Sequence, residues 1–254
     1  MLEYFKIESN LYFFLFTKHK KFDIIQVEKR ENMLNNLSNE SLRLMLILAP
    51  ILLFSIAVHE FAHAYVAYKL GDISQKNNGR LTLDPFTHMS WLGFISLLLI
   101  GIGWGKPVEV NTRNFKKPSR DLMLTSIAGP ISNLILAFLF SVILKILYVL
   151  TSTNLSINAI LMNNNLFIEF VVPLIQNAIV LNVFLALFNL LPLPPFDGGK
   201  VLEYFLPYKW KGIITFLERN ALIIFLVLVI TDIHMYIIGP LQGLILTLLQ
   251  MFIY

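Results

Sequence analysis

His59, Glu60 and His63 form an H-E-x-x-H pattern, whose residue types suit zinc-dependent hydrolysis. On a helix, positions i and i+4 lie on one face, so both histidines can present a ring nitrogen to the same metal ion. Glu60 can then reach a metal-bound water and accept its proton. The pattern therefore predicts a metal centre with hydrolytic geometry.

The surroundings of this pattern are apolar, because it lies inside the hydrophobic run 44–68. A run of this length can cross a bilayer as a helix. A charged side chain at the centre of a bilayer costs roughly 2.5–3.5 kcal/mol on insertion scales, so these residues need a compensating partner such as a metal. The location of the pattern and its chemistry support each other.

The composition of the chain is that of an integral membrane protein in contact with a lipid bilayer. Of its 254 residues, 56% are hydrophobic and 14% are charged, well below the roughly 25% charged residues of soluble domains. The net charge of +4 is spread over short loops rather than a basic face, so no nucleic-acid binding is expected. The sequence has no cysteine, so a zinc site must use histidine and carboxylate ligands.

Two histidines leave a zinc site one protein ligand short. The candidates for the third ligand are Asp84, His88, Asp197, Glu203, Asp232 and His234. Asp197 is the best of them, because prolines break the helix before it and the two glycines after it let backbone approach closely. Irregular backbone at membrane depth is tolerated where it lines a cavity. Glu203 would be the third ligand in a zinc protease of another lineage, which is a competing interpretation.

The apolar runs predict an all-α polytopic membrane protein. Full spans that form a three-helix catalytic core are expected at 44–68, 122–144 and 170–193. The first helix is expected to start near Ser41. A C-terminal helical hairpin is expected from the runs 221–238 and 241–254, separated by Gly239-Pro240.

Between the first two spans, two alternating segments predict short β-strands at 80–84 and 106–110. The apolar run between them, 91–104, is too short to span and predicts a re-entrant segment. Residues 1–40 are expected to be a poorly ordered tail, and 41–254 a single membrane-embedded domain.

Loop charges predict the orientation of the spans. Basic residues are frequent in the loops 69–121 and 199–219, whereas 151–165 carries no charge. The loops 69–121 and 199–219 are therefore expected in the cytoplasm. Lys29, Arg30 and Arg43 argue mildly for the opposite orientation. Frequent asparagine, isoleucine and lysine suit an AT-rich genome and a multi-pass protein of a bacterial plasma membrane.

At this point the sequence resembles the site-2 protease family (peptidase family M50) of intramembrane zinc metalloproteases. His-Glu-Phe-Ala-His at 59–63 matches the first motif of the family, and 189–198 match its N-x-x-P-x-P-x-x-D-G pattern in full. The segment 129–133 looks like the intermediate G-x-x-x-N element, and 104–108 resembles a loop of the compact members, which lack a PDZ or CBS domain. The resemblance covers roughly residues 44–240.

The resemblance implies a function and a set of residues. His59, His63 and Asp197 would bind one Zn²⁺, Glu60 would be the catalytic carboxylate, and Asn189 would help to polarise the scissile carbonyl. The domain 41–254 would be a zinc metalloendopeptidase that uses zinc-activated water. Its substrates would be single-span membrane proteins or peptides, cut near the cytoplasmic side.

Other interpretations stay open at the sequence level. The histidines could serve a membrane metal-ion transporter or a metal-binding protein, although the runs 122–144 and 170–193 contain no acidic residue or histidine for an ion path. Three asparagines, Asn133, Asn177 and Asn182, are expected to form interhelical hydrogen bonds rather than to act in catalysis. An unwound substrate could add as a strand to the edges at 80–84 and 106–110.

Overall fold

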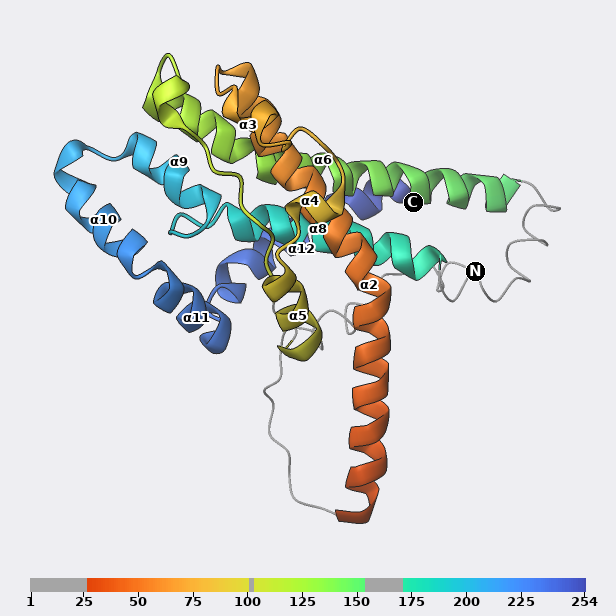
Figure 1. The fold of residues 1–254 in the computed structure, drawn as a ribbon. Helices are drawn as coiled ribbons and strands as arrows, with labels where there is room; N and C mark the ends of the chain where they lie inside the picture. Colours follow the sequence, from red (N-terminus) through yellow and green to blue (C-terminus); the bar gives the residue numbers. More distant parts are fainter. Residues whose placement is uncertain (1–26, 101–102, 154–170) are drawn as a thin grey trace.

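The computed structural model describes residues 27–100, 103–153 and 171–254, and in these ranges the chain is built from helices (Figure 1). The helices α2 (Val27–Lys69), α6 (Pro118–Thr153), α8 (Val172–Asn189) and α12 (Met235–Ile253) are the long ones. Shorter elements connect them: α3 (Ser74–Asn77), α4 (Pro85–His88), α5 (Trp91–Ile100), η1 (Thr112–Asn114), α9 (Asp197–Phe205), η3 (Tyr208–Trp210), α10 (Lys211–Arg219) and α11 (Ala221–Thr231). The predicted all-α polytopic class is confirmed.

Four segments of the described chain are long and apolar enough to cross a membrane: Leu48–Lys69, Pro118–Leu150, Val172–Asn189 and Met235–Ile253. The first three contain or overlap the predicted spans of the catalytic core. The predicted C-terminal hairpin consists of α11 and α12, but its turn is displaced. Asp232 adopts a left-handed conformation with φ of 52° and ends α11, whereas Pro240 lies inside α12.

The first long helix begins earlier than predicted. α2 starts at Val27 rather than near Ser41, while residues 1–26 of the expected tail lie outside the described residues. Gly71, at φ +118°, follows the end of α2 and turns the chain away from the helix axis. A side chain at this φ would be strained, so glycine suits the position.

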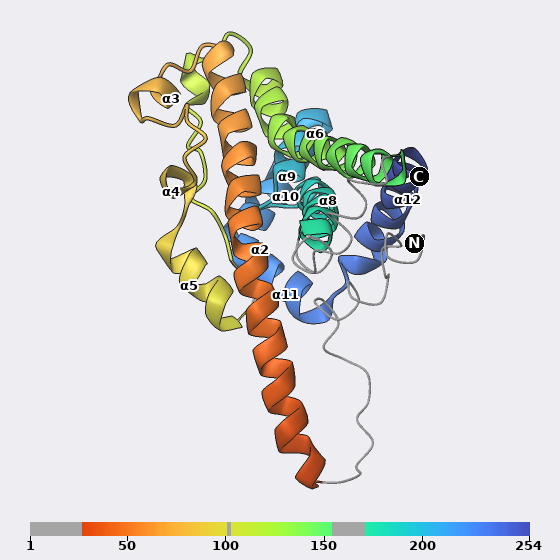
Figure 2. The ribbon, with the colours of Figure 1, turned by 90° about the vertical axis from the view of Figure 1, so that its right-hand side faces the viewer.

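The connection from α2 to α6 contains the predicted re-entrant segment but not the predicted strands. α5 leads away from the connection and the chain then returns, so that Met89 and Gly105 form an isolated antiparallel bridge. Within the described residues, 80–84 and 106–110 are not strands. In 106–111, side chains rather than a neighbouring strand bind the backbone. Figure 2 shows α3, α4 and α5 along one side of α2, with α6 and α8 on the other.

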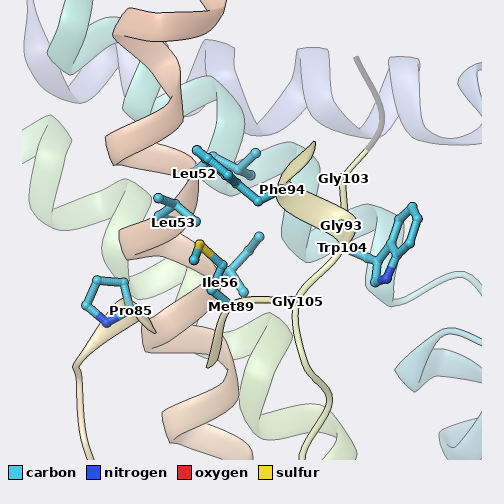
Figure 3. Close-up of a pocket in the computed structure, with 10 residues that line it drawn as sticks. All are labelled: Leu52, Leu53, Ile56, Pro85, Met89, Gly93, Phe94, Gly103, Trp104 and Gly105. Atoms are coloured by element: carbon cyan, nitrogen blue, oxygen red, sulfur yellow. The ribbon is translucent and has the colours of Figure 1, made fainter. Parts of the chain in front are cut away.

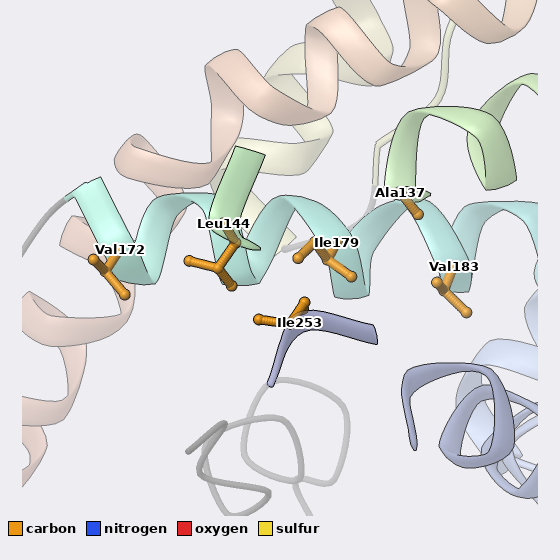
Figure 4. Packing of buried hydrophobic residues seen from close by; sticks show 6 residues of the cluster. All are labelled: Ala137, Leu144, Val172, Ile179, Val183 and Ile253. Carbon is orange, nitrogen blue, oxygen red and sulfur yellow. The ribbon is translucent and has the colours of Figure 1, made fainter. Parts of the chain in front are cut away.

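The core of the membrane-spanning part lies between α6, α8 and α12. Its buried residues are Ala137, Leu144, Val172, Ile179, Val183 and Ile253 (Figure 4). α2 packs against α6 and α8 next to this core. Buried polar side chains, among them Ser55, Asn133 and Asn182, bond to one another where α2, α6 and α8 meet, and the candidate site lies next to them.

Candidate metal centre

Three side chains from two helices converge on one point. α2 carries His59 and His63 about one turn apart, and Asp197 is the first residue of α9. The two Nε2 atoms lie 3.0 Å apart, and Asp197 Oδ2 lies 3.2 Å from His59 Nε2 and 3.1 Å from His63 Nε2. Ligand atoms around a tetrahedral zinc with bonds of 2.0–2.1 Å are about 3.3 Å apart, so the spacing suits that ion.

The hydrogen-bond partners of the outer nitrogens (Nδ1) of the two imidazoles determine which ring nitrogen carries the proton. His63 Nδ1 lies 2.7 Å from the backbone oxygen of Thr125, which can only accept, so this nitrogen carries the proton. His59 Nδ1 lies 2.6 Å from Asn133 Oδ1, and the amide nitrogen of Asn133 donates to Asn182 Oδ1. His59 Nδ1 must therefore also be the donor.

This protonation makes the inner atoms a set that could bind a metal ion. In neutral imidazoles protonated at Nδ1, the Nε2 atoms of His59 and His63 are acceptors, as is the carboxylate of Asp197. Three acceptor atoms at separations of 3.0–3.2 Å repel one another unless a cation lies among them. Two imidazole nitrogens and one carboxylate oxygen are a ligand set that zinc uses in catalytic sites, so the residues fit the metal.

Asn133 links the centre to the packing of three helices. It is fully buried on α6, and its amide nitrogen also lies 3.4 Å from the backbone oxygen of Ser55 on α2. Asn182 on α8 donates in turn to Ser55 Oγ at 2.9 Å. The interhelical bonds expected of Asn133 and Asn182 are present. The expectation for Asn177 is wrong, because its amide donates to Pro173 O within α8. The direct contact of Asn133 with His59 was not predicted, and its one sequence signal is the G-x-x-x-N element.

A glycine lets α6 approach the histidine rings. A Cβ atom at Gly129 would lie 2.6 Å from both Nε2 and Cε1 of His59 and would also collide with His63 Nε2. Such contacts are shorter than any that real Cβ atoms make. Any side chain at position 129 would therefore displace the rings from Asp197.

Asp197 is positioned by the irregular segment that follows α8. The backbone of Phe196 donates to Leu193 O, and its ring packs edge-on against Phe188 with centroids 4.6 Å apart. A Cβ atom at Gly198 would lie 2.5 Å from the carbonyl carbon of Leu190. The first turn of α9 therefore lies directly on the end of α8, which brings its aspartate to the histidines of α2.

Glu60 is oriented by the connection between α2 and α6. The backbone nitrogen of Val108 donates to Glu60 Oε2 at 2.9 Å. The same segment is fastened by Arg80, whose buried guanidinium donates to the carbonyl oxygens of Lys106 and Pro107, each at 3.4 Å. The segment that follows α5 therefore orients the predicted catalytic carboxylate.

Asn189 and the remaining candidates lie outside the three-residue cluster. The amide nitrogen of Asn189 donates to Leu185 O one turn earlier in α8, at 2.9 Å, which leaves its second hydrogen for another acceptor. Among the described residues, the other ligand candidates lie apart from the cluster: Asp84 caps α4, the His88 ring donates to Thr82 O, Glu203 is exposed on α9, Asp232 ends α11 and the His234 ring donates to Leu228 O.

A small cavity of about 20 Å³ lies between α2, α5 and the returning segment (Figure 3). Its lining is apolar and comprises Leu52, Leu53, Ile56, Pro85, Met89, Gly93, Phe94, Gly103, Trp104 and Gly105. A Cβ atom at Gly105 would lie 2.8 Å from Ile56 Cγ2, so this glycine lets the returning segment lie against α2. None of the candidate metal ligands His59, His63 and Asp197 lines this cavity, which is a packing space next to α2.

A helical membrane protein with a His–His–Asp set of this kind belongs to the class of membrane-embedded metalloproteins. The family model for peptidase family M50 matches residues 47–233, which is most of the chain. The chain belongs to this family, as its resemblance to the site-2 proteases predicted.

Curated relatives agree with this assignment. The chain is 42% identical over 199 residues to the Bacillus subtilis protein named "Putative zinc metalloprotease YwhC", covering 78% of this chain and 87% of that relative. It is 36% identical over 183 residues to "Putative zinc metalloprotease Rip2" of Mycobacterium tuberculosis, covering 69% of this chain and 63% of that relative. No solved structure matches the chain significantly.

Proposed function

We propose that the protein is an intramembrane zinc metalloprotease that hydrolyses peptide bonds of single-span membrane substrates. The observation that carries the proposal is the convergence of three acceptor atoms, from His59, His63 and Asp197, inside a membrane-spanning bundle. Membership of peptidase family M50 and the names of the relatives support a metallopeptidase that uses zinc.

The depth of the site supports cleavage within the membrane. His59 and His63 lie ten and six residues before the end of the span Leu48–Lys69. At 1.5 Å per residue, the centre is roughly 9–15 Å from that end of the helix. A peptide bond must therefore reach a point inside the bilayer, near the side on which the basic loops 69–121 and 199–219 lie.

His59, His63 and Asp197 would hold the metal, which when bound supplies Lewis-acid activation of water and of the peptide carbonyl. Glu60, with Oε2 held by the Val108 amide, accepts a proton from the attacking water as the new C–O bond forms. It then delivers this proton to the amine nitrogen as the C–N bond breaks. Asn189 has one amide hydrogen left, which can be donated to the carbonyl oxygen.

Two variants of the purified full chain test the proposal. Glu60→Gln should retain about one zinc per chain, measured by atomic emission, and lower cleavage of a single-span substrate by about 10²–10⁴-fold, because the base is removed but the ligands remain. Asp197→Ala should lose both zinc and activity. Cleavage by Glu60→Gln near the wild-type rate would exclude Glu60 as the base, and full zinc occupancy in Asp197→Ala would exclude Asp197 as a ligand.

A further inference from the structure

Between α8 and α12 the chain leaves the helical core and rejoins it at the same level. α8 ends at Asn189, and the ring of His234, directly before α12, packs against Phe188 with centroids 5.5 Å apart. Ile238, near the start of α12, lies in one apolar cluster with Leu191. The excursion through α9, α10 and α11 therefore begins and ends at the same depth, next to the end of α8.

This return means that α10 and α11 are not one span. The segments Tyr208–Arg219 and Ala221–Thr231 meet at a bend of 69°. A single span would carry the chain to the opposite side, where it could not meet Phe188 again. Figure 1 shows α9 and α10 beyond the end of α8, outside the bundle of long helices.

α10 is amphipathic, yet part of its apolar face is uncovered by protein. Ile214 is 4% exposed, whereas Ile213 and Phe216 are 49% and 64% exposed. The opposite face of the helix carries Lys211, Thr215, Glu218 and Arg219, which follow the helical spacing of three and four residues. A helix with an exposed apolar face and an exposed polar face fits the boundary between lipid and water.

The residues before α10 have the composition of a membrane boundary. Tyr208 is 85% exposed and Phe205 69% exposed, and Trp210 is 43% exposed. Lys211 Nζ lies 5.6 Å from the centre of the Tyr208 ring. Tyrosine and tryptophan are enriched at the level of the lipid headgroups, and lysine side chains extend from there towards phosphate.

We propose that residues 205–219, here called the surface segment, lie flat on the membrane and bind the headgroups of anionic phospholipids through Lys209 and Lys211. The segment contains three basic residues and one acidic residue, so its charge is complementary to an anionic leaflet. The helix that follows, α11, also exposes apolar side chains, among them Leu222, Ile223 and Ile230. Tyr208, Trp210 and Phe216 enter the headgroup region, and α10 holds the chain after α9 at the surface.

Fluorescence quenching by brominated lipids tests this proposal on the full chain. The protein is reconstituted in vesicles of phosphatidylcholine and phosphatidylglycerol, with bromine on one lipid at a time. The signal of Trp210 is the difference between the wild type and Trp210→Phe. We expect brominated phosphatidylglycerol to quench this signal at least about twofold more strongly than brominated phosphatidylcholine does. Bromine near the headgroup end of the chain should quench better than bromine near its methyl end.

Lysine variants identify the binding side chains. Lys209→Gln/Lys211→Gln should abolish the preference for phosphatidylglycerol, whereas Lys76→Gln/Lys116→Gln, with the same charge change on exposed lysines of the α2–α6 connection, should keep it. Equal quenching by both lipids in the wild type would refute headgroup binding. Stronger quenching from deep bromine would place α10 in a span, and no quenching of Trp210 would show that protein, such as a second copy, covers the segment.

Discussion

At the candidate metal centre, the Nδ1 atoms of the two histidines have fixed partners, just as their Nε2 atoms do. The H-E-x-x-H spacing is local, so the sequence predicts that His59 and His63 share a face of one helix. It does not specify that Asn133, far away in the chain, accepts from His59. An asparagine in an apolar helix seeks a polar partner, but nothing in the pattern of α6 says which one. The roles of the ligands themselves stay predictions that metal analysis must test.

Asn133→Ala should weaken zinc binding without unfolding the protein. The substitution leaves the Nδ1–H of His59 unpaired in a buried position, so the ring loses the bond that turns its Nε2 towards Asp197. Loss of such a partner of a metal-binding histidine lowers metal affinity by about 10–100-fold. Competition with a chelator, followed by measurement of bound zinc, gives the affinity.

Asn177→Ala is the matched control for this prediction. Asn177 is also buried in a membrane helix, but its amide donates to Pro173 O within α8 and does not contact a histidine. Its zinc affinity should equal that of the wild type. If both variants bind zinc equally well, the bond from His59 to Asn133 does not support the metal.

At the scale of the elements, the long apolar runs predicted the helices better than the short alternating ones predicted strands. A strand needs a neighbouring strand for its backbone, and in the α2–α6 connection side chains take that place. Gln75 Nε2 donates to Glu109 O at 2.8 Å, and the backbone nitrogen of Asn111 donates to Asp72 Oδ2 at 2.9 Å. Alternation of apolar and polar residues indicates that one side of a segment is buried. It does not indicate which groups form hydrogen bonds with the backbone N–H and C=O of that segment.

Asp72→Asn should destabilise the connection in a pH-dependent manner. Burial alone would raise the pKa of Asp72, but bonds from Ser74, Gln75, Asn111 and Asn114 outweigh it, and the pKa lies below the usual value. Stability from the ionised group is thus present at pH values above the unfolded-state pKa of about 3.9 and is lost as pH falls through the lower, folded-state pKa. We expect a loss of about 1–3 kcal/mol at pH 7 that shrinks below pH 4, measured by thermal unfolding in detergent.

Asp84→Asn provides the comparison for Asp72→Asn. Asp84 is exposed and caps α4 by accepting from the Phe86 amide, a role that asparagine fills about as well. This variant should be near neutral at both pH values. Equal losses in the two variants, or a loss in Asp72→Asn that grows at low pH, would contradict the stabilisation of the ionised Asp72.

For the whole molecule, the number of spans depends on where the C-terminal hairpin turns. Composition favoured a break at Gly239-Pro240, since both residues interrupt helices. The structure places the turn at Asp232, and α12 then has the length of a full span. Proline is accommodated inside α12, so the identity of the residue alone did not locate the turn.

The C-terminus should lie on the side of the membrane opposite the α2–α6 connection. α12 runs back along α8, since Gln242 donates to Val180 O in the middle of both helices. At its end, Tyr254 contacts the ring of Tyr148 with centroids 5.4 Å apart, near the far end of α6. With the basic loops in the cytoplasm, Tyr254 would be outside.

Because the chain has no cysteine, single introduced cysteines report the side on which each position lies. Tyr254→Cys should react with an impermeant thiol reagent in intact cells, and Lys116→Cys only after permeabilisation. The reverse pattern would invert the protein in the membrane, and equal labelling of the two would require an additional span between them.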